Sequence, residues 1–268
     1  GSDDGLVHVT RNHGETWADV TPADMPEFGR VSQIDASAFA DGRAYISVRR
    51  PLLDDFSPYI WKTDDFGASW TKIVEGIRED GYVHAVREDP TREGMLYAAT
   101  QHGVYVSYDD GGMWHALNPG LPDLPIVDLI VEADELVIAS HGRGFWVLDN
   151  MAPLRQFMPE AMEGTHLFTP PTATRSAGDV SISWRQNEAA SDARLEILDG
   201  SGEVLRTFEL ADDDAASGGP EARYRGAALP NDAGLNVLRW DLRTQPFEVF
   251  PGMIYWGVRR AAPAVPPG

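Results

Sequence analysis

One eight-residue motif occurs three times in the first half of the chain, and it constrains the fold more than any other sequence feature. Each copy has Ser or Thr first, Asp or Asn third, Gly fifth and Trp last; the copies are TRNHGETW (10–17), TDDFGASW (63–70) and SYDDGGMW (107–114). The three tryptophans follow one another at spacings of 53 and 44 residues. Repeats of this length are typical of four-stranded β-propeller blades.

Apolar residues alternate with polar ones on both sides of each motif, which predicts a strand, a Gly-containing turn and a second strand. Similar runs continue to residue 150, and Leu96–Asp109 aligns without a gap on Leu136–Asp149 at a shift of 40 residues. We expect strands at 30–37, 43–50, 58–63, 69–74, 82–89, 96–101, 103–108, 113–118, 125–132, 135–140 and 144–149. Propellers close with roughly four to eight blades, and these strands with the first hairpin make only about three and a quarter. Residues 1–150 are therefore predicted to form an incomplete arc, either part of a longer protein, which we favour, or paired with another chain.

The second half of the chain has a different composition. Four prolines and the absence of a sustained period favour a linker at 151–178. Alternation then returns, and DGSG (199–202) between two apolar runs is typical of a tight hairpin turn. The acidic stretch at 211–222 predicts a solvated loop. Residues 179–268 thus predict a small, incomplete antiparallel β-sandwich, and the chain as a whole is predicted to be all-β.

Composition excludes several classes of function. Asp and Glu number 42 against 22 Lys and Arg, and the net charge of −20 argues against nucleic acid or anionic membranes as partners. The chain has no cysteine, and its histidines lack the spacing of a zinc site, so we expect no metal and no cofactor. The chain has no run of about 18 apolar residues, so membrane insertion is not predicted. Serine-hydrolase, P-loop and dinucleotide fingerprints are also missing.

The motif resembles the Asp-box, or bacterial neuraminidase repeat, of sialidases, xyloglucanase-type enzymes and the sortilin ectodomain, although Asn12 replaces the Asp and Met113 the usual hydroxyl. Longer stretches such as GSDDGLVHVTRNHGETW and SHGRGFWVLDN are similar to bacterial sortilin-like propeller proteins, often labelled glycosyl hydrolases. ARLEILDGSGEVLRTF resembles the immunoglobulin-like module that follows the propeller there, which is similar to that of flagellar hook-capping proteins. The resemblance implies a secreted, periplasmic or surface setting. It does not imply one activity, because propellers host many functions.

The motif residues have a structural interpretation. A short carboxylate or amide can accept backbone N–H bonds within a turn, Gly tolerates positive φ, and the Trp can pack onto the neighbouring blade. Motifs on separate blades cannot form the carboxylate pair of a glycosidase, whose members lie about 5–10 Å apart. The residues given this structural role are Asn12, Gly14, Trp17, Asp65, Gly67, Trp70, Asp109, Gly111 and Trp114.

The segment RRPLLDDFSPY (49–59) lengthens one repeat and predicts a long loop, a common place for function. Its candidate ligand-binding residues for a sugar or peptide are Arg49, Asp54, Asp55 and Tyr59. The alternative is a solvated loop with capping aspartates. As a general acid, either aspartate would need a pKa raised by burial.

The segment SHGRGFW (140–146) is the second candidate. His141 and Arg143 alternate with Gly142 and Gly144, which permit a sharp turn or close approach of a ligand. The alternative is that Arg143 pairs with a carboxylate and fixes the turn. We interpret His84, which lies inside a predicted strand, as a packed side chain.

No catalytic residue can be named from these patterns. The first functional hypothesis is a non-catalytic recognition and scaffold module that binds a glycan or polypeptide. The resemblance also implies that the remaining blades of the same protein are partners. The alternative is a glycoside hydrolase with part of its active site in missing blades.

Overall fold

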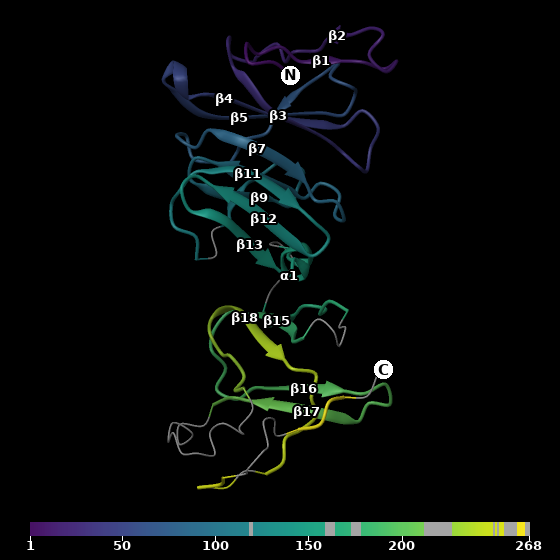
Figure 1. The fold of residues 1–268 in the computed structure, drawn as a ribbon, viewed down its shortest axis with the longest axis vertical. Coiled ribbons are helices and arrows are strands. Elements are labelled where there is room, and N and C mark those ends of the chain that lie inside the picture. The colour runs from purple at the N-terminus through teal and green to yellow at the C-terminus, as the bar shows by residue number, and fades with distance from the viewer. Residues whose placement is uncertain are drawn as a thin grey trace. The chain divides into compact units, whose positions relative to one another are not determined.

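The computed structural model in Figure 1 divides the chain into two units of β-structure, Gly1–Met151 (unit 1) and Ala152–Gly268 (unit 2). It describes residues 1–117, 120–158, 164–172, 178–211, 227–248, 250, 252–254 and 262–265. None of the helices in these ranges has the length and hydropathy of a membrane span.

Four antiparallel sheets, in sequence order, make up unit 1 (Figure 1). The first sheet has two strands, β1 (His8–Val9) and β2 (Ala18–Asp19), and the last has three, β11 (Ile126–Val131), β12 (Glu135–Ser140) and β13 (Gly144–Asp149). The second sheet has four strands: β3 (Arg30–Ala36), β4 (Ala44–Arg50), β5 (Asp55–Thr63) and β6 (Thr71–Lys72). The third also has four: β7 (Val83–Glu88), β8 (Leu96–Thr100), β9 (Gly103–Ser107) and β10 (His115–Ala116). Each strand pairs with its sequence neighbour, as expected for strands joined by short turns. The predicted all-β class and the strand positions are confirmed, but the fourth strands β6 and β10 are only two residues long.

The core of unit 1 lies between successive sheets. β3 and β4 pack against β7, and β7 and β8 pack against β11. The side chains of Tyr45 and Ile60 from one sheet join Val86, Leu96 and Tyr105 from the next in one buried cluster. Every residue of β8 and β9 is buried, which explains their nearly continuous apolar sequences.

All three motifs form the same turn. In the second copy the Thr63 hydroxyl donates to Asp65, the Gly67 amide donates to Thr63 Oγ1 at 2.9 Å, and the Ser69 amide donates to Asp65 Oδ1 at 2.8 Å. The equivalent bonds are present in the first copy, from Gly14 to Thr10 and Thr16 to Asn12, and in the third, from Gly111 to Ser107 and Met113 to Asp109. Two consecutive residues with positive φ close each turn: His13–Gly14, Phe66–Gly67 and Asp110–Gly111.

The three motif tryptophans differ in their surroundings. The indole of Trp70 donates to the Val20 carbonyl at 2.6 Å, and that of Trp114 donates to the Ile73 carbonyl at 3.0 Å. Each bond reaches the residue that follows the last strand of the preceding sheet. Trp17 is 60% exposed, so the predicted packing of this Trp onto a neighbour is wrong for the described chain. Its sheet is the first that the structure describes.

The two ends of the stacked sheets carry different turns. Successive turns of an antiparallel sheet alternate between its ends. One end, the motif face, carries the motif turns and the β3–β4 and β7–β8 turns. The opposite end, the loop face, carries the turns at 51–54, 101–102 and 141–143. The motif turns therefore lie at one end of the sheets, and both candidate segments lie at the other end.

The described residues of unit 2 form two small antiparallel sheets around a shared core. One sheet has the order β14 (His166–Leu167), β15 (Val180–Gln186) and β18 (Gly234–Trp240), and the other pairs β16 (Arg194–Leu198) with β17 (Val204–Glu209). Trp184 and Leu238 of the first sheet pack with Phe208 of the second. The predicted DGSG turn joins β16 to β17, where the Gly202 amide donates to the Asp199 carbonyl.

The prediction of a linker at 151–178 needs correction. Residues 152–156 form the short helix α1 (Ala152–Gln156), and β14 pairs with Arg185 and Trp184 of β15. Phe168 is 2% exposed, which explains why this segment joins unit 2 rather than crossing its surface. Most of the predicted acidic loop, 212–222, lies outside the described residues.

Candidate functional site

The segment 49–59 is not the long loop that its sequence predicts. β4 continues to Arg50, a 3-10 helix occupies Pro51–Leu53, and β5 begins at Asp55. Arg50 lies opposite Asp55 in the register, and its Nη1 lies 2.7 Å from Asp55 Oδ2. The additional residues therefore lengthen a hairpin, which the ion pair closes, and the turn itself spans only 51–54.

The sheet separates the candidate residues of this hairpin. Tyr59 lies on the face of β5 that is turned toward the preceding sheet, and its ring stacks on that of Trp61 of the same strand, with centroids 5.6 Å apart. Its hydroxyl donates to Asp55 Oδ2 at 2.9 Å. Arg49 reaches the following sheet instead, where it contacts His84. Arg49 and Tyr59 therefore do not form the single site that their proximity in sequence suggested.

Neither aspartate of the hairpin has the properties of a general acid. Burial raises the pKa of Asp55. Hydrogen bonds from the Ser57 amide, the Tyr59 hydroxyl and the Arg50 guanidinium together lower it by more, so the pKa lies below its ordinary value. A glycosidase acid needs the opposite shift. Asp54 is exposed and has a φ of 59°, which makes it a turn residue.

A cluster of basic side chains lies on the loop face between neighbouring sheets. Arg49 Nη1 lies 3.0 Å from His84 Nδ1. A guanidinium only donates hydrogen bonds, so Nδ1 accepts and neutral His84 carries its proton on Nε2. His84 is 8% exposed, and its Nε2 has no hydrogen-bond partner within the described part of the chain. Tyr82 covers this imidazole, with ring centroids 5.0 Å apart.

His84 is held in its neutral form. Burial is the main reason that its pKa falls to about 4, and the charges of Arg49 and His141 lower the pKa as well. The side chain of Gln101 acts the other way and raises it. Arg49 lies at the end of β4 and His84 at the start of β7. Gln101 lies in the β8–β9 turn and His141 in the β12–β13 turn. The structure therefore places the sequence candidate Arg49 in contact with the imidazole of His84, and the charge of the candidate His141 lowers the pKa of that imidazole.

The β12–β13 turn is not fixed by an ion pair of Arg143, which was the alternative interpretation of its sequence. The predicted pairing of Arg143 with a carboxylate is absent among the described residues, and Arg143 is exposed. The Ser140 hydroxyl instead donates to the Gly144 carbonyl at 2.7 Å. Gly142 and Gly144 supply φ values of 86° and 70°. The backbone thus shapes the turn, and His141 and Arg143 remain open to solvent.

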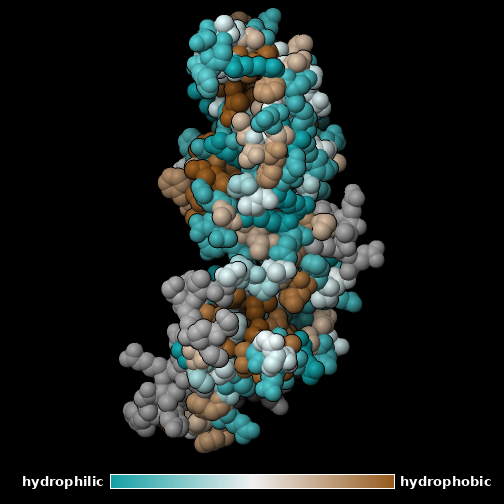
Figure 2. Space-filling model, turned by 90° about the vertical axis from the view of Figure 1, so that its right-hand side faces the viewer, coloured by the Kyte–Doolittle hydropathy of each residue, from teal (hydrophilic) through white to brown (hydrophobic). Residues whose placement is uncertain are grey.

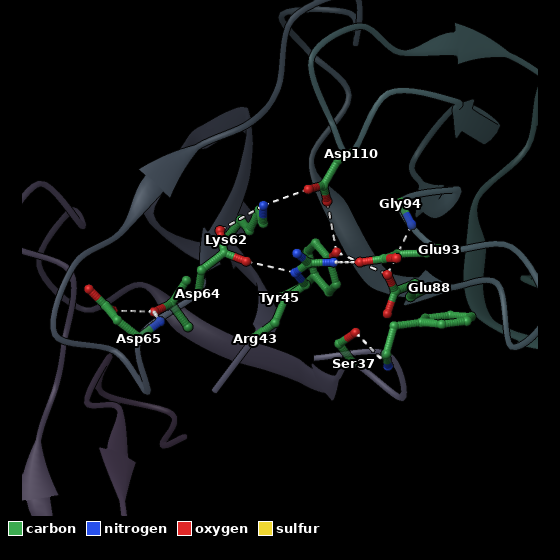
Figure 3. A network of polar contacts seen from close by, with 12 residues as sticks. Ser37, Arg43, Tyr45, Lys62, Asp64, Asp65, Glu88, Glu93, Gly94 and Asp110 are labelled. Atoms are coloured by element: carbon green, nitrogen blue, oxygen red, sulfur yellow. Dashed lines mark hydrogen bonds and ion pairs between the residues drawn. The ribbon is translucent and has the colours of Figure 1, made fainter. Parts of the chain in front are cut away.

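The motif face carries a network of carboxylates and cations, seen in Figure 3. Arg43 pairs with Asp64 and Glu93, and Lys62 pairs with Asp64 and Asp110, which lie in successive motif turns. These ion pairs connect two neighbouring sheets and raise the pKa of Arg43, chiefly through Asp64. The network is therefore a brace between sheets.

A pair of carboxylates within this network shares one hydroxyl. Tyr45 Oη lies 2.8 Å from Asp110 Oδ1 and 3.3 Å from Glu88 Oε1. Burial, followed by the bond to Asp110, raises the pKa of Tyr45. Glu88 is only 8% exposed and also accepts the Gly94 amide, so this pair is not open to a substrate.

Sequence reasoning missed the role of His84. It correctly predicted a packed histidine, but no sequence signal joins His84 to Arg49, which lies 35 residues away in another sheet. Among the described residues, no group of three His, Asp or Glu side chains could hold a metal ion.

Comparisons with known proteins give only distant similarities. Neither a family model nor a curated protein matches the chain. The GH74 xyloglucanase of Xanthomonas campestris aligns at 20% identity over 77% of this chain and 34% of its own, with a TM-score of 0.43. A GH74 enzyme of Niastella koreensis gives 11% identity over 79% and 35%, with a TM-score of 0.44.

A third similar structure is the extracellular domain of a protein from B. thetaiotaomicron described as a one-component system. It aligns at 10% identity over 94% of this chain and 36% of its own, with a TM-score of 0.39. The chain thus spans about a third of the length of each of these structures. At this level of similarity they do not assign a function to the chain.

Proposed function

We propose that this chain is a recognition and scaffold part of an extracytoplasmic β-propeller protein, and that its loop face binds a glycan or polypeptide without reacting with it. One observation carries this proposal: the guanidinium of Arg49 reaches from one sheet to the buried imidazole of His84 in the next, where Arg49 Nη1 lies 3.0 Å from His84 Nδ1. No described carboxylate lies within ion-pair distance of Arg49.

The chemistry of the cluster suits recognition. The guanidinium of Arg49 donates several hydrogen bonds in a fixed plane, which matches the hydroxyl and carbonyl oxygens of sugars and peptides. Tyr82 and Phe56, with ring centroids 6.1 Å apart, add aromatic surface beside it, and Phe56 is 45% exposed. Aromatic rings beside a few hydrogen-bonding groups are typical of ligand sites.

We further infer that the motifs are Asp-boxes and that unit 1 is part of a sortilin-like propeller. The three identical turns and the two indole-to-carbonyl bonds support this inference. The two sheets and shared core of unit 2 support an immunoglobulin-like module. The remaining blades, the ligand and the secreted, periplasmic or surface location belong to the same proposal.

The glycoside hydrolase alternative has no specific observation in its favour. A glycosidase needs two carboxyl groups that flank one sugar bond, one of them with a raised pKa. On the loop face, Asp55 is paired with Arg50 and has a lowered pKa, and Asp54 is exposed. No hydrolytic role is therefore assigned.

A binding screen tests the proposal. The purified chain is applied to glycan and peptide arrays, and a hit is quantified by calorimetry. We expect Arg49→Ala to weaken binding about tenfold or more, as for loss of a charged hydrogen bond. The control Arg194→Ala removes the same charge from an exposed position in unit 2 and should bind normally. Sugar release that Asp54→Ala or Asp55→Ala abolishes would contradict the proposal, as would the absence of any ligand.

A further inference from the structure

The outer edge of β13 lacks a strand that two other sheets of unit 1 possess. β6 pairs with β5, and β10 pairs with β9, but no described strand pairs with the outer side of β13. The residues after β13 do not fill this position. The Met151 amide donates to the Asp134 carbonyl, at the β11–β12 turn, and the chain continues into α1.

The internal repeat shows what is missing at this edge. The alignment at a shift of 40 residues places Tyr105 and Val106 of β9 on Phe145 and Trp146 of β13. Tyr105 and Val106 pair with the two residues of β10 and are 4% and 2% exposed. Phe145 and Trp146 are 79% and 37% exposed. Among the described residues, no two-residue strand equivalent to β10 pairs with β13, and the edge presents backbone groups that can pair with another strand.

A pocket beside Leu117 marks the position of a missing tryptophan. The amides of Val20, Ile73 and Leu117 donate to equivalent carbonyls, those of Val7, Ile60 and Val104, so the three residues occupy the same position in successive sheets. The carbonyls of Val20 and Ile73 each accept an indole N–H, from Trp70 and Trp114. Within the described chain, no group donates to the Leu117 carbonyl.

The surroundings of Leu117 are apolar and open. An open pocket lies here, and its volume of about 410 Å³ includes the solvent space at its mouth. It is lined by Val104, Leu117, Leu121, Ile138, Trp146 and Val147. In Figure 2 hydrophobic residues lie open on unit 1 at the height of β12 and β13 in Figure 1. The pocket thus adjoins the unpaired edge on the side where an indole would enter.

We propose that the β13 edge and the Leu117 pocket together bind an extended segment of a different protein, in which a tryptophan immediately precedes two strand residues. The two residues pair with Phe145 and Trp146 as β10 pairs with β9. The indole enters the pocket and donates to the Leu117 carbonyl, as Trp114 donates to that of Ile73. Binding by strand addition takes affinity from the backbone bonds and specificity from the side-chain pocket.

The charge of the chain narrows the choice of segment. At a net charge of −20, the protein repels acidic peptides. The sequence GASWTKIV, residues 67–74, has the required Trp and two following strand residues, one lysine and no carboxylate side chain. It occupies the equivalent position on β5 and therefore serves as the probe.

The experiment titrates labelled GASWTKIV into the whole chain and follows fluorescence anisotropy. We expect saturable binding that falls about tenfold or more when alanine replaces the tryptophan of the peptide. Val147→Asp places a charge in the pocket lining at a residue that is 51% exposed, so the fold should tolerate it while binding falls by a similar factor. Val127→Asp, at a residue 40% exposed on β11 outside the pocket lining, is the matched control and should bind normally.

Three results would overturn the proposal. They are the absence of binding at millimolar peptide, equal binding of the alanine peptide, and equal weakening by the two aspartate substitutions. Light scattering of the protein alone tests a further occupant. A dimer that Trp17→Ala dissociates would assign the edge to a second copy and contradict the proposal.

Discussion

The sheet of β7–β10 and the sheet of β11–β13 have matching sequences and different surroundings. Leu96–Asp109 aligns on Leu136–Asp149 without a gap, and both segments form two antiparallel strands. All residues of β9 are buried, whereas five of the six residues of β13 are exposed. Alternating apolar residues are therefore sufficient for the strand. Burial depends on a fourth strand and on a neighbouring sheet.

The comparison also shows what the motif contributes. In the β7–β10 sheet the motif turn brings Trp114 back against Ile73 and begins β10. After β13 there is no motif, and no described residue occupies the equivalent pocket at Leu117. Turn, tryptophan and fourth strand act as one unit that connects each sheet to the one before it.

Trp114→Ala should be the most destabilising change. The side chain is 2% exposed and its indole is hydrogen bonded, so its removal should lower the free energy of unfolding by about 3–5 kcal/mol. Trp17→Ala removes the same group where it is 60% exposed and should cost under about 0.5 kcal/mol. Urea unfolding followed by circular dichroism measures both. Equal losses would mean that Trp17 is also buried in solution.

Tyr105→Ala and Phe145→Ala compare the two sheets at aligned positions. Tyr105 is 4% exposed and belongs to the buried cluster, so we expect a loss of about 3 kcal/mol. Phe145 is 79% exposed, and its removal should change stability by no more than about 0.5 kcal/mol. The same urea titration applies. A large loss for Phe145→Ala would show that the β13 edge is already covered in solution.

Gly111→Ala should cost more than Gly142→Ala, although both glycines have positive φ. A left-handed alanine costs about 1–2 kcal/mol at either position. At Gly111 the new Cβ would also lie 2.5 Å from Ile73 Cδ1, whereas at Gly142 it would meet no atom within 4 Å. Thermal unfolding should therefore rank Gly111→Ala below Gly142→Ala. Equal melting temperatures would show that the motif turn is not pressed against the preceding sheet.

Asp65→Ala should make stability less dependent on acid pH. The hydroxyl and amide of Ser69 lower the pKa of Asp65 to about 2. Because the folded pKa lies below that of an unfolded aspartate, about 4, the carboxylate stabilises the fold above pH 4 and loses this effect as the pH falls toward 2. The difference between wild type and Asp65→Ala should therefore be present at pH 6 and shrink below pH 4.

Asp149→Ala provides the control for this acid effect. Asp149 aligns with the motif residue Asp109 but is exposed and lies outside a motif turn. Within the described chain its carboxylate accepts none of the turn hydrogen bonds that the motif aspartates accept, so its removal should not reproduce the effect of Asp65→Ala. A change as large as that of Asp65→Ala would mean that the hydrogen bonds of the motif turn are not the cause.

The fold was more predictable than the site. Strands of unit 1 and the motif turns follow from local alternation and from Asp and Gly at fixed positions. The predictions of a linker at 151–178 and of a long loop at 49–59 were wrong. Pairing of β14 with β15 and of Arg50 with Asp55 joins residues that no local pattern connects. For the same reason the contact of Arg49 with His84 was not predicted.

The sequence by itself determined the secondary structure class, the repeat and the chemistry of the motif turn, because these depend on residues within a few positions of one another. Only the tertiary structure decided which copies of a pattern are buried. It packed Trp114 and left Trp17 exposed, and it placed Arg49 beside His84 and Tyr59 on the opposite side of the sheet. The physical reason is that burial and pairing depend on the neighbouring sheet, which the alternation within one strand does not encode.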